Sequence, residues 1–510
     1  MNLLTDDVFK VISQKGSFRA SLPELLAVLG QDRVEALAGV QRHQADILHI
    51  FLCYLAGSVL VRSDQSNPNQ NADFWRDGLR SLAGRADDCA WEIVIDDPTK
   101  PAFMQPPAPS REIFERAYKP KAETPDSLDV LQTAKNHDIK AARAGSADME
   151  AWILSLISLQ TASGFLGNGN YGIARMNGGF GSRVYVGWQE DRRAGSRFNR
   201  DVGVLLDCRR ELLQPPYPYV EGGQTCLWLE PWDGTVGFSL SSLDPFFIEV
   251  SRRIRLVDCG DRIVAFGATS NSARISAQNL QGNVGDPWTP IKEDKLSALT
   301  PSANGFTPSL LRDLLFRKNY RPSPMQIAPA RGSSGWFCTS VLVRGQGITD
   351  GFHEAAVRIP ARARPIMFGK SDKRDRLAEL SQRGLDMAGA IQNKALRPAL
   401  YALLEGGPDS VDFNKREIGV WVNSQARIYW SSWQPLYFDW LWTTIDIKED
   451  VVALQPWFEK LKNLSKNAIE KAISRVPSRN GRGYRAITQA NNAFYRGLYK
   501  HFPDYMEEKK

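Results

Sequence analysis

The sequence predicts an α+β protein with a large mixed N-terminal domain, residues 1–370, and a C-terminal four-helix bundle, residues 371–510. A chain of 510 residues usually divides into two or more domains, because single hydrophobic cores stop growing beyond about 250–300 residues. In the first part, Ile254 and Leu256 alternate with polar neighbours at period two, which is typical of strands. After residue 371, apolar residues recur every three or four positions, which is typical of helices.

The N-terminal segment predicts a short strand followed by two helices. Ser21 is the predicted N-cap of the first helix, because Pro23 stands in the first turn and Glu24 lies three residues on, as in a capping box. The apolar run over residues 49–61 is too short to span a bilayer core about 30 Å thick. This run therefore predicts a buried helix, and we expect no membrane association.

Composition and charge indicate a protein of the cytoplasm. The six cysteines are scattered and none are paired at metal-site spacing, so we expect a reducing compartment and no bound metal. The first residues lead directly into Asp6 and Asp7, unlike a signal peptide. The net charge of +7 is small for this length, but residues 451–510 carry 12 Lys or Arg against 5 Asp or Glu. We therefore expect a basic C-terminal end.

The densest run of glycines lies between residues 164 and 181. Glycine lets a backbone adopt positive φ and approach another molecule closely. A helix is predicted before this run, at residues 152–157, and a strand after it, at residues 184–186. We expect an exposed loop with Arg175 and Arg183 on or beside it, suited to contact with a phosphate backbone or a narrow groove.

The same run also matches a nucleotide-binding pattern, because Gly167, Gly169 and Gly172 are spaced as in G-x-G-x-x-G. That pattern requires a strand before it and a helix after it, and the predicted order here is the reverse. A P-loop is excluded because Asn170, and not lysine, follows Gly169. A nucleotide-dependent enzyme that uses the glycine-rich loop 164–172 is therefore the alternative interpretation, and we expect neither a cofactor nor a catalytic residue.

The rest of the chain predicts strands, a hairpin and then the helices. A strand over residues 340–343 leads into residues 344–352, which have the composition of a tight turn. Short connections between four amphipathic helices favour an antiparallel bundle, in which the tryptophans are core residues. The four predicted stripes are Leu377, Leu380, Met387 and Ile391; Trp430, Trp433, Tyr437 and Trp440; Trp457, Leu461, Leu464, Ala468 and Ala472; and Ile487, Ala490, Phe494 and Leu498.

Taken together, these segments resemble CasA, the large subunit of the type I-E CRISPR Cascade complex. The order, the spacing and the span of the matching segments, from one end of the chain to the other, carry the resemblance. The matching segments are Met1–Leu4, Ser21–Leu26, Pro101–Gln105, Lys135–Asp138, the loop 164–181, Arg344–Gly345, Thr349–Glu354 and the terminal helices.

The resemblance implies a DNA-binding subunit and not an enzyme. Members of this family read the short protospacer-adjacent motif on duplex DNA, largely from the minor groove, and help to start strand separation and R-loop formation in antiviral defence. Their partners are double-stranded target DNA, the 5′ end of the guide RNA, the other Cascade subunits and the helicase-nuclease. The guide RNA reads most of the target sequence, while the protein reads the motif and the shape of the DNA.

The resemblance also assigns residues of this chain to the DNA motif. The loop that enters the minor groove matches Gly167, with Asn168 and Gly169 beside it. The loop that meets the guide-RNA end and the groove matches Lys135 and Asn136.

Two further assignments follow from the resemblance. A minor-groove lysine matches either Lys292 or Lys295, and the spacing leaves both open. The strand-separating hairpin matches Gly347, Ile348, Thr349 and Asp350, where better-known members carry a glutamine at the tip. An acidic residue beside DNA is unexpected.

Overall fold

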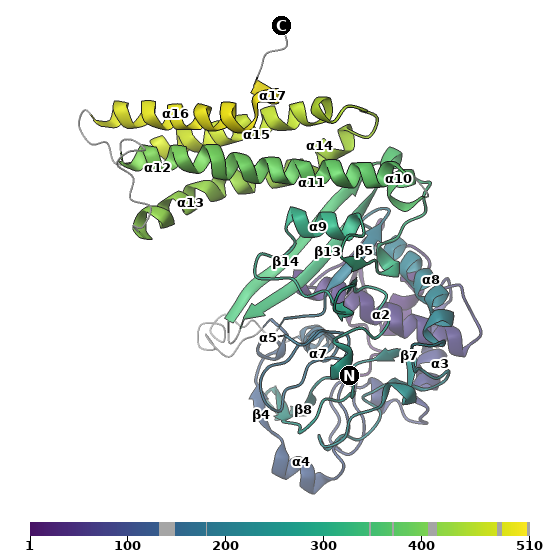
Figure 1. Cartoon of the computed structure of the whole chain (residues 1–510). Helices are drawn as coiled ribbons and strands as arrows, with labels where there is room; N and C mark the ends of the chain where they lie inside the picture. The colour runs from purple at the N-terminus through teal and green to yellow at the C-terminus, as the bar shows by residue number, and fades with distance from the viewer. Residues whose placement is uncertain are drawn as a thin grey trace. The chain divides into compact units, whose positions relative to one another are not determined.

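The computed structural model of the chain describes residues 1–131, 148–179, 181–345, 348–369, 372–405, 416–476 and 482–506 (Figure 1). Contacts within the chain divide it into two compact units. Unit 1 comprises Met1–Phe306, Asn319–Ala328 and Gly335–Val357, and unit 2 comprises Thr307–Lys318, Pro329–Ser334 and Arg358–Lys510. The helices and small sheets together make a mixed α+β protein, as predicted, whereas the division of the chain after residue 370 stays a prediction.

Unit 1 mixes helices with small sheets around one hydrophobic core. Its helices are α1 (Leu22–Gly30), α2 (Arg42–Arg62), α3 (Ala72–Ala83), α4 (Arg111–Ala117), α5 (Pro125–Leu128), α7 (Met149–Ala162) and α8 (Ala194–Leu212). Its strands are β1 (Phe9–Ser13), β2 (Gly16–Ala20), β3 (Ala36–Leu37), β4 (Lys119–Ala122), β5 (Tyr185–Gln189), β6 (Gln224–Cys226), β7 (Leu243–Ile248), β8 (Arg253–Asp258), β9 (Ile263–Ala268), β10 (Ile291–Lys292), β11 (Ser297–Ala298), β12 (Tyr320–Arg321), β13 (Gly335–Gly345) and β14 (Ile348–Ile359), which ends in unit 2.

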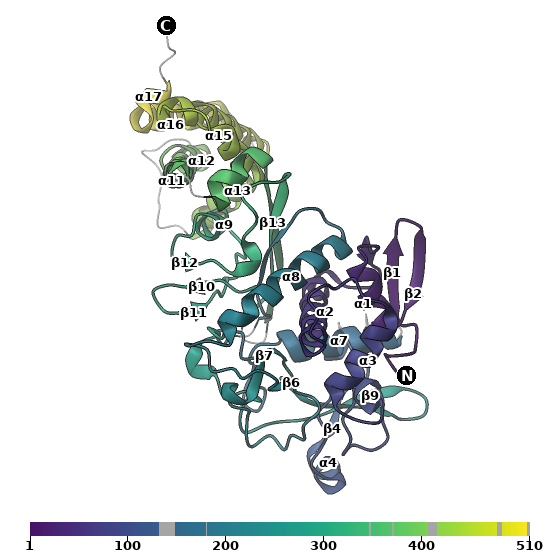
Figure 2. The same ribbon diagram turned by 90° about the vertical axis from the view of Figure 1, so that its right-hand side faces the viewer.

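The N-terminal elements confirm the predicted cap and the predicted buried helix. Ser21 donates from its backbone N and its Oγ to Glu24 Oε2, at 2.9 and 2.8 Å. Helix α2 is 21 residues long, so it is longer than predicted and long and apolar enough to cross a membrane by length and composition. However, 78% of its most apolar window is buried, and α3, α7 and α8 pack around it (Figure 2). This burial is typical of a core helix.

The strands form small sheets that hold the loops of unit 1. Strands β8 and β9 pair antiparallel over residues 253–258 and 263–268, which confirms the predicted strand at Ile254 and Leu256, and β4 joins β9 on its other edge. A second sheet has the order β14-β13-β5, so that the predicted strand at residues 340–343 lies in its middle. Strand β5 follows the glycine-rich run, and β13 leads toward the predicted hairpin tip.

Unit 2 is helical. Its helices are α9 (Pro308–Leu315), α10 (Arg364–Phe368), α11 (Lys373–Ile391), α12 (Arg397–Glu405), α13 (Arg416–Trp433), α14 (Tyr437–Thr443), α15 (Asp450–Ile473), α16 (Arg482–His501) and α17 (Pro503–Met506). Helix α11 continues through a π-helical turn, Gln392–Leu396, into α12. Within this unit α11, α12, α13, α15 and α16 lie side by side (Figure 1).

The predicted tryptophan stripe lies mostly in the core of unit 2, on two helices and not one. Pro435 lacks an amide hydrogen, and the segment Gln434–Leu436 that contains it is a 3₁₀ turn between α13 and α14. Trp433 and Trp440 are buried and both pack against Trp457, with ring centroids 6.1 and 4.9 Å away. Packing in the core therefore explains these side chains without base stacking, although Trp430 is 37% exposed.

Candidate nucleic-acid interface

The glycine-rich loop, residues 163–184, joins the end of α7 to the start of β5. The order of helix, loop and strand is as predicted, and it is the reverse of the order that a dinucleotide-binding turn requires. Two backbone hydrogen bonds close the base of the loop, from Gly164 N to Gly181 O at 3.0 Å and from Phe165 N to Gly179 O at 2.8 Å. The loop is therefore a folded excursion with a fixed base.

The loop tip is a tight turn that needs glycine at two positions. Leu166 N donates to Asn170 O at 2.9 Å, and Asn170 N donates to Gly167 O at 3.0 Å. Gly167 has φ of 95° and Gly169 has φ of 78°, a region that residues with a Cβ rarely adopt. A Cβ on Gly167 would meet open space, and Asn168 is exposed. The tip thus presents its backbone, the amide of Asn168 and the exposed side chain of Leu166 to solvent.

The other glycine of the tip faces the protein. A Cβ on Gly169 would lie 2.6 Å from Thr269 Cβ, and Ser270 N donates to Gly169 O at 3.0 Å. Tyr171 donates its hydroxyl to Asn271 O at 2.9 Å. The segment after β9 therefore supports one side of the tip, while the side that carries Gly167 stays open.

The guanidinium of buried Arg252 donates hydrogen bonds to the start of the loop. Its Nη2 donates to Ser163 Oγ at 3.0 Å and to Gly164 O at 2.7 Å, and its Nη1 donates to Tyr171 O. Gln160 on α7 accepts from Arg252 N at 2.8 Å. One guanidinium thus bridges the outgoing and returning arms of the loop.

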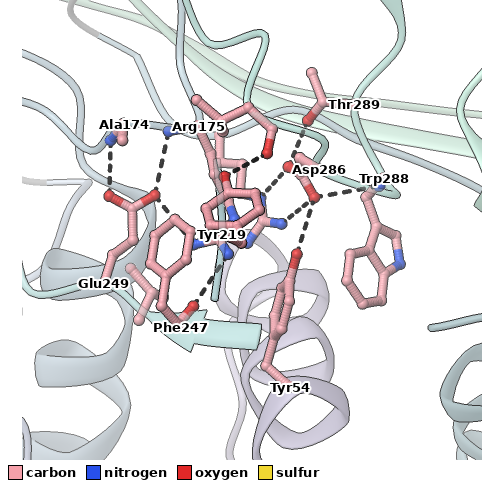
Figure 3. Close-up of polar contacts among 12 residues, drawn as sticks. Tyr54, Ala174, Arg175, Tyr219, Phe247, Glu249, Asp286, Trp288 and Thr289 are labelled. Carbon is pink, nitrogen blue, oxygen red and sulfur yellow. Dashed lines mark hydrogen bonds and ion pairs between the residues drawn. The ribbon is translucent and has the colours of Figure 1, made fainter. Parts of the chain in front are cut away.

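Arg175 does not reach solvent, contrary to the prediction that it would lie on an exposed loop. Its side chain is 3% exposed and forms an ion pair with buried Glu249, at 3.2 Å between Nη1 and Oε1 (Figure 3). Glu249 also accepts from the backbone N of Ala174 at 2.7 Å and of Arg175 at 3.2 Å. Phe247 packs under the guanidinium, 3.7 Å from ring centroid to Cζ. The returning arm is therefore clamped to the end of β7.

Arg183 is also buried, so it too contradicts the expected exposed cation. It pairs with Asp286, with 2.7 Å between Nε and Oδ2. Tyr54 of α2 donates its hydroxyl to the same carboxylate at 3.4 Å, and Thr289 donates its hydroxyl at 2.8 Å (Figure 3). Burial opposes ionisation of Asp286, but Arg183 outweighs it and lowers the pKa of that carboxyl. Both loop arginines thus anchor the loop and are not free for phosphate.

The two candidate lysines lie on another part of unit 1. Lys292 on β10 is partly exposed and forms an ion pair with Asp294 at 3.4 Å, while Lys295 is exposed in the following turn. Among the described residues, neither lysine forms a hydrogen bond or ion pair with the glycine-rich loop. Gly282, in the segment before β10, lies between this part of the unit and the returning arm of the loop, because a Cβ on it would lie 2.6 Å from Ala298 Cβ on β11 and 2.7 Å from Met176 C.

The remaining predicted residues are only partly described. Lys135, Asn136 and Gly347 lie outside the described residues. Ile348, Thr349 and Asp350 begin β14, which pairs with β13 in the predicted hairpin.

The sequence did not point to Arg252, Glu249 and Asp286, whose contacts hold the loop. The one local signal was an acidic residue, Glu249, inside the apolar run 246–250.

Comparisons with known proteins agree on the fold. No protein-family model and no curated protein sequence matches the chain. CasA (Cse1) of Thermus thermophilus matches 98% of this chain and 99% of its own, with 15% identity and a TM-score of 0.62. Cse1 of Acidimicrobium ferrooxidans matches 99% of both chains, with 13% identity and a TM-score of 0.64. A chain of a CRISPR RNA-guided surveillance complex matches with 12% identity and a TM-score of 0.60, covering 97% of this chain and 99% of its own.

These likenesses extend over nearly the whole chain. The predicted resemblance to CasA is therefore confirmed for the fold.

Proposed function

We propose that this chain is the large subunit of a type I-E RNA-guided CRISPR surveillance complex. In this proposal it recognises the protospacer-adjacent motif on duplex DNA, aids strand separation and positions the helicase-nuclease, and it works in the cytoplasm without catalysing a reaction. The likeness over 99% of both chains to Cse1 of Acidimicrobium ferrooxidans carries the proposal. Purification of the chain from its native cell tests the proposal. The chain should co-purify with a small RNA and several other subunits, and a chain that purifies alone would contradict the proposal.

The loop tip is suited to reading DNA from the minor groove. That groove is about 6 Å wide, so a bulky side chain at the closest point of approach would block entry by sterics. Gly167 has no side chain and faces open space, and the clamps at Arg252, Glu249 and Asp286 hold the base of the loop. In this proposal the backbone and the Asn168 amide touch the base edges, while the arginines stay inside.

Gly167→Trp tests this assignment, with Gly260→Trp as the matched control. Both glycines have φ near 90°, at 95° and 90°, and both would place a Cβ in open space, so the backbone strain is alike. Gly260 lies in the turn between β8 and β9. We expect Gly167→Trp to weaken target-duplex binding by the assembled complex at least tenfold, about 1.4 kcal/mol. Assembly on guide RNA should survive in both variants, and equal target affinity for both would contradict groove entry.

The hairpin of β13 and β14 is the proposed strand-separating element. A duplex opener inserts a side chain between base pairs, and unstacking costs a few kcal/mol per step. Ile348 is the apolar candidate for this insertion, with Thr349 beside it. We assign Asp350 to bracing the turn, because an ionised carboxylate repels phosphate and cannot donate a hydrogen bond.

We further propose that the helices of unit 2 form a four-helix bundle, made of α11 with α12, α13 with α14, α15 and α16, that holds the displaced strand. Helix α16 has no acidic residue, and two parallel stripes lie on its exposed face. One stripe is aromatic and the other basic, a combination that suits single-stranded DNA. The stripes are Tyr484, Tyr495 and Tyr499, and Arg485, Arg496 and Lys500.

A further inference from the structure

Both arms of the glycine-rich loop line a pocket of about 410 Å³, which we call the loop pocket. Its walls are residues 164–165 of the outgoing arm, residues 171–174 and 176–179 of the returning arm, and the segment 277–281. Gly178, Gly179 and Gln278 are exposed, so the pocket opens to solvent. Its volume lies within the range of about 300–1,000 Å³ that small-ligand sites occupy.

The chemistry of the lining favours an uncharged, planar ligand. None of the described residues that line the loop pocket carries a charged side chain, so a phosphate or a carboxylate would find no counter-ion there. Apolar and aromatic side chains form much of the wall, as in pockets that take flat, neutral rings. They are Phe165, Tyr171, Ile173, Ala174, Met176 and Ala277.

The two aromatic rings of the lining stand directly before and after the loop tip. The ring centroids of Phe165 and Tyr171 lie 6.3 Å apart, with 57° between the ring planes. Phe165 N donates to Gly179 O at 2.8 Å, and the Tyr171 hydroxyl donates to Asn271 O at 2.9 Å. Because these bonds hold both residues and the tilt keeps the rings from stacking on each other, a planar ligand can stack against one of them.

Two side-chain amides of the lining have no protein partner. Neither the amide of Asn177 nor that of Gln281 forms a hydrogen bond with another described residue, and neither amide is buried. A Cβ on Gly282 would lie 2.9 Å from Asn177 N, so the two amides come from segments that touch. An amide offers a donor and an acceptor side by side, which is the pattern with which Asn and Gln pair with the edge of a base.

We propose that the loop pocket takes one unstacked nucleobase, which stacks against Phe165 or Tyr171 and offers its edge to Asn177 and Gln281. Pockets for flipped bases combine stacking on aromatic or apolar side chains with hydrogen bonds to the base edge. The source of the base rests on the proposed function, in which the loop tip enters the groove. A base held between the arms of the loop would offset part of the cost of unstacking. Either the displaced DNA strand or the guide RNA would supply it.

Saturation-transfer NMR of the full chain with each of the four deoxynucleosides tests the pocket. We expect saturable binding of at least one nucleoside in the millimolar range, because a single base brings one stacked ring and a few hydrogen bonds. Phe165→Leu and Tyr171→Leu each remove a ring and keep an apolar side chain, and at least one should weaken binding at least fivefold, about 1 kcal/mol. Absence of saturable binding, or unchanged affinity in both variants, would overturn the proposal.

Matched variants separate the pocket from general effects on the fold. Phe114→Leu removes a partly exposed ring of α4 in the same unit, which packs 4.9 Å from Tyr118 between centroids, and should bind nucleosides as the wild type does. If the ring variants do not fold, Asn177→Ala still tests the pocket, because it removes an amide without a partner among the described residues. It should change the relative affinities of the four nucleosides, whereas Asn304→Ala, at an exposed asparagine, should not. Unchanged affinities in Asn177→Ala would overturn the proposal.

Photocrosslinking with iodouracil then identifies the source of the base in the assembled complex. The reactive base is placed beside the motif in the displaced strand, or near the 5′ end of the guide RNA, and the crosslinked peptides are mapped. A crosslink within residues 164–179 from the DNA identifies the displaced strand, and one from the RNA identifies the guide. No crosslink there from either would overturn the proposal. Nucleoside binding needs no other subunit, so it can hold even if the chain purifies alone, and the two proposals fail separately.

Discussion

Glu249→Gln should loosen the glycine-rich loop by breaking its clamp. The substitution keeps the size of the side chain and an oxygen that can accept from the Ala174 amide, but it removes the negative charge beside Arg175. Removing one partner of a buried pair costs about 3–5 kcal/mol, because the other charge stays buried and uncompensated. Arg175 still donates to Phe247 O at 3.0 Å and stacks on that ring. We therefore expect the lower end of the range, about 3 kcal/mol.

The measurement is guanidinium denaturation of the full chain followed by tryptophan fluorescence, with the transition midpoint compared at an unchanged slope. Glu123→Gln is the matched control, because it breaks the exposed pair of Glu123 with Arg262, whose side chains are 62% and 56% exposed. A surface pair is worth about 0–1 kcal/mol. If both variants shift the midpoint equally, the carboxylate of Glu249 does not stabilise the loop.

The double variant Glu249→Gln with Arg175→Met separates charge from packing. Replacing both members of a buried ion pair is often nearly neutral, so methionine on Phe247 should restore most of the lost stability. A double variant that is as unstable as the sum of the single variants would show that no coupling exists between the two side chains. The same variants should bind target DNA in the order of their loop stability.

Three other predictions follow from the structure. Lys292→Ala with Lys295→Ala should reduce the salt slope of target-DNA binding by about 0.9 for each lysine on a phosphate, and an unchanged slope contradicts that contact. Burial opposes the ionised form of Asp201, but His49 and nearby arginines lower its pKa to about 2. Asp201 should therefore contribute on the order of 2 kcal/mol of stability that is lost between about pH 4 and pH 2, and in urea denaturation Asp201→Asn should reduce the loss over this range by about that amount. Ile348→Ala with Thr349→Ala should slow opening of a paired target and spare one already unpaired beside the motif; equal loss on both refutes strand separation.

Local patterns predicted the local structure well. The capping box at Ser21, the helix before the glycine run and the strand after it depend on neighbouring residues, and each is present. The extent of α2 was underestimated, because polar residues such as Arg42 and Gln44 begin it outside the apolar run. Pro435 marked the break between α13 and α14, but the aromatic stripe around it concealed that signal.

The direction of the loop arginines could not be predicted, because their partners are distant in sequence. Glu249 lies 74 residues after Arg175, and Asp286 lies 103 residues after Arg183. An arginine in a glycine-rich run looks the same in sequence whether it faces DNA or a buried carboxylate. Only the packing of β7 and of the segment 286–289 against the loop decides between the two, and no local periodicity encodes that packing.

This buried pairing separates affinity from recognition in the proposed complex with DNA. Phosphate contacts supply most of the salt-dependent affinity but carry no sequence information, whereas base edges carry it. Because Arg175 and Arg183 are neutralised inside, the loop tip offers uncharged groups, which are its backbone, the amide of Asn168 and the exposed side chain of Leu166. The salt-dependent part of binding must therefore come from other basic residues, such as Lys295 and those on α16. An uncharged tip on a rigid base can then contact the base edges of many sequences without binding tightly to the phosphates of any of them.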